Sequence, residues 1–335
     1  MAGGVPLLSR RRMITVLAAA AAAAAPLLPR RLEAKTPRPW VWRGTALGAP
    51  ATLILDHPDG AAAEAAVAAC LDEIERLERE FSLQRQDSAL SRLNANSRLA
   101  MPSLDMLAVL EAAAAVSGAS GGAFDITVQP LWRLYARHFR TYPGDEEGPS
   151  DEDIAEALQW VDYRRLSLAP GLITLPANVS VTMNGIAQGY ITDRVATLLR
   201  GLGWAHVMID LGEMYALGSR ADGSSWTVAV DGPSGAQCPL PLLNLSGRAV
   251  ATSSAAGTMF APSGRHHHLF DPRSGRSASR CMQVTVMAEQ AALADALSTA
   301  LFVARPEERE HILGRFPGSE CLIVETGGRF TRIAS

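Results

Sequence analysis

The sequence contains few cysteines, and none of them has the spacing of a metal or redox centre. Its 335 residues include four, Cys70, Cys238, Cys281 and Cys321, with no C-x-x-C pair. Their pairing in an oxidising compartment cannot be read from their positions. Cys70 lies in an alanine-rich helical run, where we expect a small buried residue. The cysteines therefore indicate neither a metal site nor a redox site.

Other signatures are missing as well. The absence of a G-x-G-x-x-G fingerprint removes the usual argument for dinucleotide binding, and no G-x-S-x-G elbow is present. No stretch reaches the roughly 18 unbroken apolar residues of a membrane span. Nothing resembling a linker or repeat divides the mature chain, so its roughly 300 residues form one large domain or two ordinary ones.

The N-terminus has the pattern of an export signal. Ser9-Arg-Arg-Arg12 precedes a short, alanine-rich apolar run that begins at Val16. This pattern predicts a twin-arginine-type signal over residues 1–34, with cleavage between Ala25 and Lys35. We expect a soluble, periplasmic mature protein. The alternative is an uncleaved anchor, which would hold the same domain on the same side of the membrane.

Removing this segment makes the protein more acidic. The whole chain carries 31 basic and 34 acidic residues. Cleavage after Ala34 removes five arginines and one glutamate, which leaves 26 against 33, a net charge of −7. An acidic body without a basic run argues against nucleic-acid binding and against an anionic membrane surface.

Hydrophobic periodicity predicts a mixture of helices and short strands without a regular βαβ repeat, which indicates the α+β class. The predicted helices cover 61–81, 104–116 after the N-cap Ser103, a stretch beginning at Ser150, and 291–302. The predicted strands are a hairpin over 166–175 and the segments 207–210, 226–230, 249–252 and 284–287.

The central motif of the chain is Val181–Arg194. It predicts an apolar strand, a tight Asn184-Gly185 bend, a second glycine at Gly189 and a helix that ends before Gly201. Such a turn brings backbone N–H groups close to a bound phosphate or other anion. The alternative is a glycine turn that serves only packing.

A second candidate site lies on the last predicted helix. Asp295 and Thr299 are one helical turn apart, so a carboxylate and a hydroxyl share a face. Hard oxygen ligands of this kind suit magnesium or calcium. In the alternative, the threonine hydroxyl bonds a helix carbonyl and the aspartate is solvated or paired.

Three consecutive histidines, 266–268, suggest zinc, but alternation along a strand would let at most two point together. A single functional histidine is more economical, with His268 as base and Asp271 as its orienting partner. Ser253 or Ser254 leaves a serine hydrolase open as an alternative, against which stands the missing nucleophile elbow.

Six motifs occur together in one order, and as a set they resemble the ApbE family of FAD:protein FMN transferases from about Gly44 to the C-terminus. They are S-x-x-R-x-D-S-x-L-S-R-L-N at 82–94, G-G-A-F-D at 121–125, I-A-Q-G-Y with T-D-R at 186–194, V-A-T-S at 250–253, H-x-x-D-P-x-S-G at 268–275 and A-D-A-x-x-T at 294–299.

The resemblance implies one ApbE-like domain over residues 44–335 and a magnesium-dependent transferase. Family members cleave FAD, join its FMN half to a Thr or Ser hydroxyl of a partner protein, and release AMP. It further implies a role for each matching residue. These are flavin binding by Gly122, Ala123, Phe124 and Asp125, further FAD contacts by Gln84, Thr182, Gly185, Gln188 and Thr252, metal ligation by Asp295, Thr299 and the Ala187 carbonyl, and assistance to the acceptor hydroxyl by His268 and Asp271.

The chain departs from the family pattern at four of its positions. Gln84 replaces a common tyrosine, Thr182 an aspartate, Asn184 a glycine and Gln188 a lysine or glutamate. Weaker stacking at position 84 and a lost acid at 182 put FAD affinity in question. Alternative functions are therefore an FAD-binding protein, an FAD pyrophosphatase without protein transfer, and a non-catalytic maturation factor.

The implied partner is an exported or membrane respiratory flavoprotein with an Asp-x-x-Ser/Thr-Gly-Ala-Thr-like motif. The chain contains a partial copy of this motif at 231–237, but the last threonine is missing. A Gly/Pro/Ser turn after a strand explains the same residues, so we do not expect self-modification.

Overall fold

An eight-stranded antiparallel sheet forms the centre of the fold in the computed structural model, which describes residues 14–16, 39–57, 59–233 and 241–335. Its strand order is β16-β15-β14-β11-β8-β7-β3-β2. The bounds are β2 Trp40–Ala46, β3 Ala49–Leu55, β7 Val207–Asp210, β8 Met214–Leu217, β11 Arg248–Ser254, β14 Cys281–Ala288, β15 Glu320–Glu325 and β16 Phe330–Ala334.

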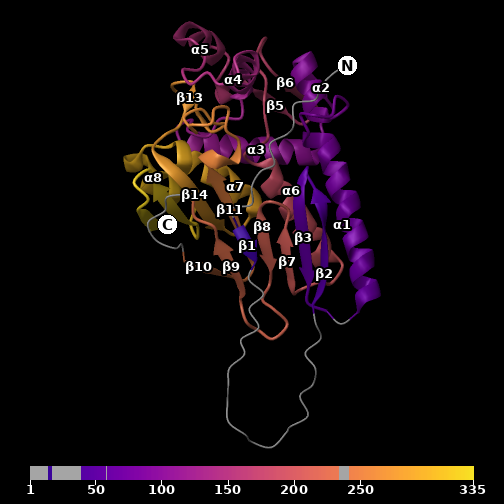
Figure 1. Cartoon of the computed structure of the whole chain (residues 1–335). Helices are drawn as coiled ribbons and strands as arrows, with labels where there is room; N and C mark the ends of the chain where they lie inside the picture. The colour runs from indigo at the N-terminus through magenta and orange to yellow at the C-terminus, as the bar shows by residue number, and fades with distance from the viewer. Residues whose placement is uncertain (1–13, 17–38, 58, 234–240) are drawn as a thin grey trace, which may run out of the picture.

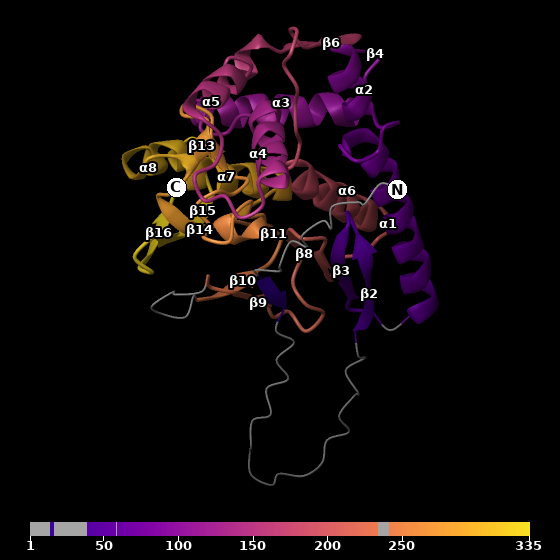
Figure 2. The same cartoon turned by 45° about the horizontal axis from the view of Figure 1, so that its top comes forward.

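Helices cover one face of this sheet (Figures 1 and 2). They are α1 Gly60–Phe81, α3 Leu104–Ala119, α6 Ala187–Gly201, α7 Ala291–Val303 and α8 Pro306–Gly314. The central helix is α7, which packs on β11 and β14 and against α3, α6 and α8. All its residues except Leu293 and Thr299 are buried. A helix that is apolar on nearly every side belongs in the middle of a core, so its few polar residues need an explanation.

A small sheet of order β1-β9-β10 packs on the opposite face. Its strands are β1 Ile14–Val16, β9 Trp226–Val230 and β10 Leu242–Leu245. A separate apolar cluster joins Trp226 and Val228 of β9 to Met208, Val250 and Met287 of the large sheet. The backbone of β1, which lies within the expected export signal, pairs antiparallel with β9. The rest of that signal lies outside the described residues.

The upper part of the molecule in Figure 1 carries the remaining elements. They are α2 Ala89–Asn96, α4 Gln129–Thr141, α5 Asp151–Leu158, the small sheet of β4 Arg98–Ala100, β6 Leu172–Thr174 and β5 Ser167–Ala169, and the pair β12 Phe270–Asp271 with β13 Arg276–Ser277. A third apolar cluster, centred on Tyr135 of α4 with Phe260 and Phe270, fixes the segment between β11 and β14. Among the described helices, none combines the length and apolar character that a membrane crossing requires.

The α+β prediction is confirmed, and so are the predicted helices and all the predicted strands except the one before the Asn184-Gly185 bend. The predicted 61–81, 104–116 and 291–302 helices correspond to α1, α3 and α7, and Ser103 and Ser150 cap α3 and α5 as expected. The strands at 249–252 and 284–287 are longer than predicted.

The predicted strand before the Asn184-Gly185 bend is wrong. Residues 181–183 belong to no strand. The Asn94 side chain accepts a hydrogen bond from Val181 N (2.7 Å) and donates one to Val181 O (2.8 Å), while Thr182 N donates to Ile126 O (2.8 Å). These partners satisfy the backbone groups that a neighbouring strand would otherwise bind.

Candidate active site

The first turn of α6 meets the N-terminal half of α7 at Gly189. The Gly189 N–H donates to Asp295 Oδ2 at 3.1 Å, and Asp295 is only 5% exposed. A Cβ at position 189 would lie 2.2 Å from the Ala291 carbonyl oxygen, so only glycine permits this approach. The second glycine of the central motif therefore brings α6 against α7 and aims a backbone N–H at a buried carboxylate.

Gly185, just before α6, adjoins Thr299, which lies one turn after Asp295 on α7. A Cβ built at this position would lie 3.2 Å from Thr299 Oγ1 and 3.1 Å from the Phe124 ring. Ser253 Oγ of β11 lies 3.1 Å from Thr299 Oγ1 and 2.8 Å from Ser298 Oγ. The hydroxyl of Thr299 thus has a neighbouring hydroxyl as partner, and the alternative of a simple bond back to a helix carbonyl is not what the structure shows.

Ala187, the predicted carbonyl ligand, lies between these two glycines at the start of α6. Gly185 adjoins Thr299 on one side, and Gly189 binds Asp295 on the other. The three predicted metal-binding residues come from two helices that are far apart in sequence, and they gather where α6 begins. Among the described residues, no group of three or more His, Cys, Asp or Glu side chains lies together. The set contains a single carboxylate and two neutral oxygens.

The predicted flavin-binding turn, Ala123–Asp125, follows α3. Gly121 and Gly122 both have positive φ (58° and 80°), which turns the chain back at the helix end. The Asp125 carboxylate is 8% exposed and accepts from Thr127 N (2.7 Å), Thr127 Oγ1 (2.6 Å) and Tyr163 N (3.0 Å). Burial raises the pKa of Asp125, although these hydrogen bonds act in the opposite direction. Its role in this structure is to hold the turn that presents Phe124 to Gly185.

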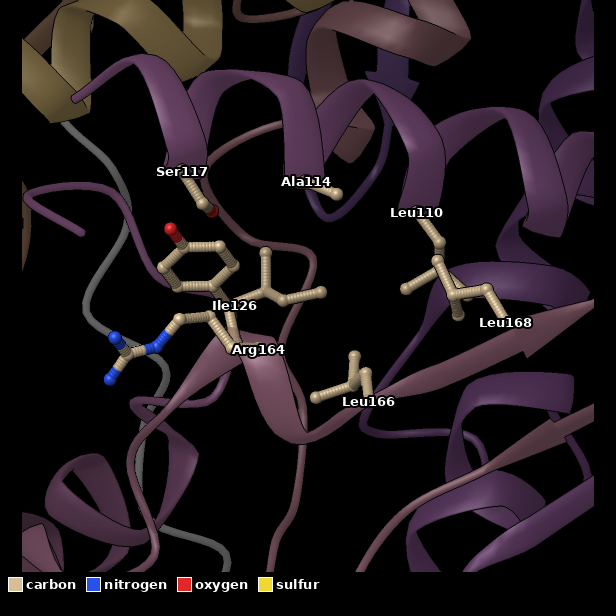
Figure 3. Close-up of a pocket in the computed structure, with 8 residues that line it drawn as sticks. Leu110, Ala114, Ser117, Ile126, Arg164, Leu166 and Leu168 are labelled. Atoms are coloured by element: carbon tan, nitrogen blue, oxygen red, sulfur yellow. The ribbon is translucent and has the colours of Figure 1, made fainter. Parts of the chain in front are cut away.

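A cleft of about 210 Å³ adjoins this turn but contains none of the predicted site residues. Its lining residues are Leu110, Ala114, Ser117, Ile126, Tyr163, Arg164, Leu166 and Leu168. Figure 3 shows the residues of α3 on one side, facing Leu166 and Leu168, whereas the Arg164 guanidinium points away from the apolar side chains. The cleft is smaller than the roughly 300–1,000 Å³ of ordinary ligand pockets. It is a neighbour of the site and not its centre.

The four residues that depart from the family pattern have different surroundings. Gln84 and Asn184 are exposed, whereas Thr182 is buried and its Oγ1 accepts from Asn184 N at 3.3 Å. Gln188 is also buried, and its Nε2 donates to Leu211 O at 2.6 Å. Gln188 therefore ties the start of α6 to the turn between β7 and β8.

The side chain of Thr252 does not point toward Asp295 and Thr299. Residues of β11 alternate between the two sheet faces, and Ala249 and Ala251 belong to the core under α7. Ser253 shares that face, whereas Thr252 Oγ1 lies on the other and is 2.8 Å from Thr285 Oγ1. Ser253 is thus the β11 side chain that adjoins Thr299, and the sequence analysis did not assign it to this set.

The three consecutive histidines have three separate environments and do not form a metal site. They lie outside any strand, apart from one isolated bridge at His267. His266 Nε2 donates to Glu146 O at 3.1 Å, within the Tyr135 aromatic cluster. His267 is buried, with Nε2 2.8 Å from Ala278 O and Nδ1 accepting from Leu269 N at 3.3 Å. Only His268 is half-buried rather than buried.

His268 is oriented by a backbone carbonyl. Its Nδ1 lies 3.1 Å from Thr258 O, which can only accept, so Nδ1 carries the proton and Nε2 the lone pair. A Cβ at Gly257 would lie 3.0 Å from His268 Cε1, so the ring packs on this glycine. The imidazole is therefore held in the tautomer that a general base requires.

Asp271, the predicted orienting partner of His268, binds two arginines in the structure. Asp271 Oδ1 accepts from Arg273 N (3.0 Å) and Nε (2.8 Å), and Oδ2 accepts from Arg273 Nη2 (3.2 Å) and Arg280 Nη1 (3.3 Å). Burial acts to raise the pKa of this carboxyl, but the arginine hydrogen bonds outweigh it and the pKa lies below its usual value. Asp271 anchors the turn after β12, and the Thr258 carbonyl holds Nδ1 of His268.

The buried His267 predicts an acid-labile fold. Burial lowers its pKa from 6.5 to about 4, so the folded state stays neutral while the unfolded state takes up a proton below pH 6.5. Its stabilising contribution is complete above pH 6.5 and is lost as the pH falls toward 4. At pH 5 this loss is about 2 kcal/mol. We expect urea unfolding at pH 7 and pH 5 to show this difference in the wild type.

His267→Gln tests the assignment, because its amide can still donate to Ala278 O but does not titrate. The variant should lose less stability between pH 7 and pH 5 than the wild type does. Comparing the two pH dependences cancels groups such as Asp193, whose raised pKa acts with opposite sign. Equal pH dependences for both proteins would refute the prediction.

The described cysteines, Cys70, Cys281 and Cys321, are buried free thiols, which confirms the expectation for Cys70. Cys238 and most of the partial acceptor motif at 231–237 lie outside the described residues.

Comparison with known proteins agrees with this arrangement. A model of the ApbE family matches residues 47–323. The chain is 31% identical to the FAD:protein FMN transferase of Treponema pallidum over 287 residues, 78% of each chain. It is 28% identical to the FAD:protein FMN transferase of Haemophilus influenzae, over 79% of this chain and 81% of that protein. The crystal structure of the ApbE protein from Thermotoga maritima superposes with a TM-score of 0.76 at 28% identity, over 88% of this chain and 97% of that one. The resemblance of the six motifs is therefore confirmed, and the chain belongs to the ApbE family.

Proposed function

We propose that this protein is an FAD:protein FMN transferase, which moves FMN from FAD to a Thr or Ser hydroxyl of an acceptor protein and releases AMP. The observation that carries this proposal is the convergence at the start of α6, where Gly189 N–H binds Asp295 and Gly185 adjoins both Thr299 and Phe124. A transfer of this type depends on positioning the substrate and on neutralising phosphate charge. Backbone N–H groups, and a metal ion held by oxygen ligands, would meet these two requirements.

The residues present fit a magnesium ion. Asp295 is a carboxylate inside an otherwise apolar helix, and Thr299 places its hydroxyl one turn further along the same face. Carboxylate, hydroxyl and carbonyl oxygens are the donors that magnesium prefers. Asp295, Thr299 and the Ala187 carbonyl would hold the ion. When bound, it would neutralise charge on the pyrophosphate of FAD.

The chain's own groups account for the remaining requirements. The acceptor hydroxyl oxygen attacks the phosphorus of the FMN half, the bond between that phosphorus and the bridging oxygen breaks, and AMP leaves with that oxygen. The hydroxyl proton goes to Nε2 of His268, whose Nδ1–H is held by Thr258 O. Gly189 lets α6 approach the start of α7, and Gly185 keeps a side chain away from Thr299 Oγ1 and the Phe124 ring.

We also propose that the protein acts outside the cytoplasm on an exported or membrane-bound electron-transfer protein with an Asp-x-x-Ser/Thr-Gly-Ala-Thr-like motif. The arginine run at 10–12 followed by the apolar run supports this proposal.

The test is an assay with FAD, Mg²⁺ and an acceptor domain that carries the motif. Transfer predicts stoichiometric AMP and a flavin-fluorescent acceptor band after denaturing electrophoresis, and an acceptor whose Thr or Ser is replaced by Ala should stay dark. AMP and free FMN without an acceptor would instead show a pyrophosphatase. Bound FAD without AMP would show a binding protein, and no FAD binding would show a non-catalytic factor. The three latter outcomes each contradict the proposal.

A further inference from the structure

The N-terminus of α7 is capped by a side chain from another helix. Its own N-cap residue, Gln290, makes no side-chain capping hydrogen bond. Instead, Asp193 of α6 accepts from Ala291 N through Oδ1 (2.8 Å) and from Ala292 N through Oδ2 (2.9 Å). These are two of the N–H groups that a helix leaves unpaired at its start, and a carboxylate there also opposes the positive end of the helix dipole.

This cap acts together with the contact at Gly189. Positions 189 and 193 are one helical turn apart, so both face α7 from the same side of α6. Gly189 N–H holds Asp295, and the missing Cβ lets the backbone approach Ala291. Asp193 binds the N–H groups of Ala291 and Ala292 at this same close approach. The two contacts fix how far α7 lies from α6 and its rotation about its own axis.

The rotation of α7 decides where its polar residues point. Asp295 and Thr299 lie one and two turns after Ala291, and apart from Ser298 the rest of the helix is apolar. We propose that Asp193 is a positioning residue for the metal-binding set: its carboxylate locks the start of α7 to α6, so that Asp295 and Thr299 face Ala187. This role rests on the proposed function, since it concerns the same metal site.

The environment of Asp193 is consistent with a carboxylate held for this purpose. Burial raises its pKa to about 6, while the hydrogen bonds from Ala292 and Ala291 and the charge of Arg200 act in the opposite direction. A buried carboxylate needs hydrogen-bond partners to offset the cost of its burial. Both oxygens of Asp193 find these partners in backbone N–H groups of α7, so its effect on Asp295 and Thr299 passes through the backbone of this helix.

The chain offers a matched control for an ordinary helix cap. Asp59 Oδ1 accepts from Ala61 N (3.0 Å) and Ala62 N (3.1 Å) at the start of α1. This helix contains none of the predicted site residues. Asp59→Asn and Asp193→Asn therefore make the same chemical change at two helix starts, only one of which leads to the site.

The experiment titrates Mg²⁺ against thermal stability in the full chain and follows hydrogen exchange of residues 291–299. Asp193→Asn should raise the Mg²⁺ concentration for the half-maximal thermal shift about tenfold, as typical for partners that orient a ligand. In this variant the amide hydrogens at the start of α7 should exchange faster. Excess Mg²⁺ should restore its rate of FMN transfer. Asp59→Asn should lower the melting temperature without changing the Mg²⁺ requirement.

An unchanged Mg²⁺ requirement in Asp193→Asn, beside an Asp295→Asn protein that no longer responds to Mg²⁺, would overturn only the role of Asp193. Identical Mg²⁺ responses of the wild type and Asp295→Asn would overturn the proposed metal site and this role with it. The variant at position 295 thereby separates a failure of the inference from a failure of the proposed function.

Discussion

Asp295→Asn is expected to lower the rate of FMN transfer by about a thousandfold, because the carboxylate is the one charged oxygen donor in the proposed magnesium set. Asparagine has nearly the same shape, and its Oδ1 can still accept from Gly189 N–H, which now binds Asp295 Oδ2 at 3.1 Å. The substitution therefore removes charge and leaves the contact between α6 and α7. The measurement is AMP release and acceptor fluorescence at several Mg²⁺ concentrations.

A control must show that the loss does not follow from removing any partly buried acid near the core. Asp105 of α3 accepts from Tyr190 Oη (2.7 Å) and pairs with Arg76 (2.8 Å), and it lies outside the proposed site. Asp105→Asn should lose stability but keep its transfer rate within a few-fold. Full transfer by Asp295→Asn, or a loss as large in Asp105→Asn, would contradict the assignment of Asp295.

Most of the helical layer could be predicted from local sequence signals. Ser103 and Ser150 begin α3 and α5 because their hydroxyls bond the backbone of the first turn, at Met106 N and Asp153 N. The α7 helix was predicted to within one residue because a continuous apolar run lies between a strand and the Arg305-Pro306 boundary. These signals lie within a few residues of the structure they specify.

The errors arise where the deciding partner is distant in sequence. Val181 follows the pattern of a strand, but Asn94, 87 residues earlier, supplies its hydrogen bonds. His268 was paired with Asp271 by proximity in sequence, whereas in the fold its Nδ1 bonds the carbonyl of Thr258, ten residues earlier. No local pattern reports such contacts.

Ser253 was not predicted as a neighbour of Thr299 for a different reason. Strand side chains alternate between faces, so a shift of one residue moves the prediction to the opposite side of the sheet. Which face meets α7 depends on how β11 packs, which the strand pattern alone does not specify. The capping role of Asp193 could not be predicted either, because the helix that it caps, α7, begins nearly a hundred residues later.

His268→Asn is expected to lower the transfer rate by about 10²- to 10⁴-fold while leaving FAD affinity close to that of the wild type. The asparagine amide can donate to Thr258 O as His268 Nδ1 does at 3.1 Å, so the segment between β11 and β14 keeps its anchor. What the variant lacks is the basic Nε2 that would accept the proton of the acceptor hydroxyl. The loss should therefore appear in the single-turnover rate with saturating acceptor, and not in an FAD titration.

His206 provides the matched control, because its Nδ1 also bonds a backbone carbonyl, that of Ser219, at 2.8 Å. It lies just before β7 and outside the proposed site, so His206→Asn should transfer FMN at nearly the wild-type rate. A His268→Asn protein with full transfer would refute the base assignment. Weak FAD binding by the same variant would assign His268 to substrate binding instead. A rate that falls with FAD binding intact is the result that only a proton acceptor explains, since the ring's anchoring bond is retained and its packing partner, Gly257, is unchanged.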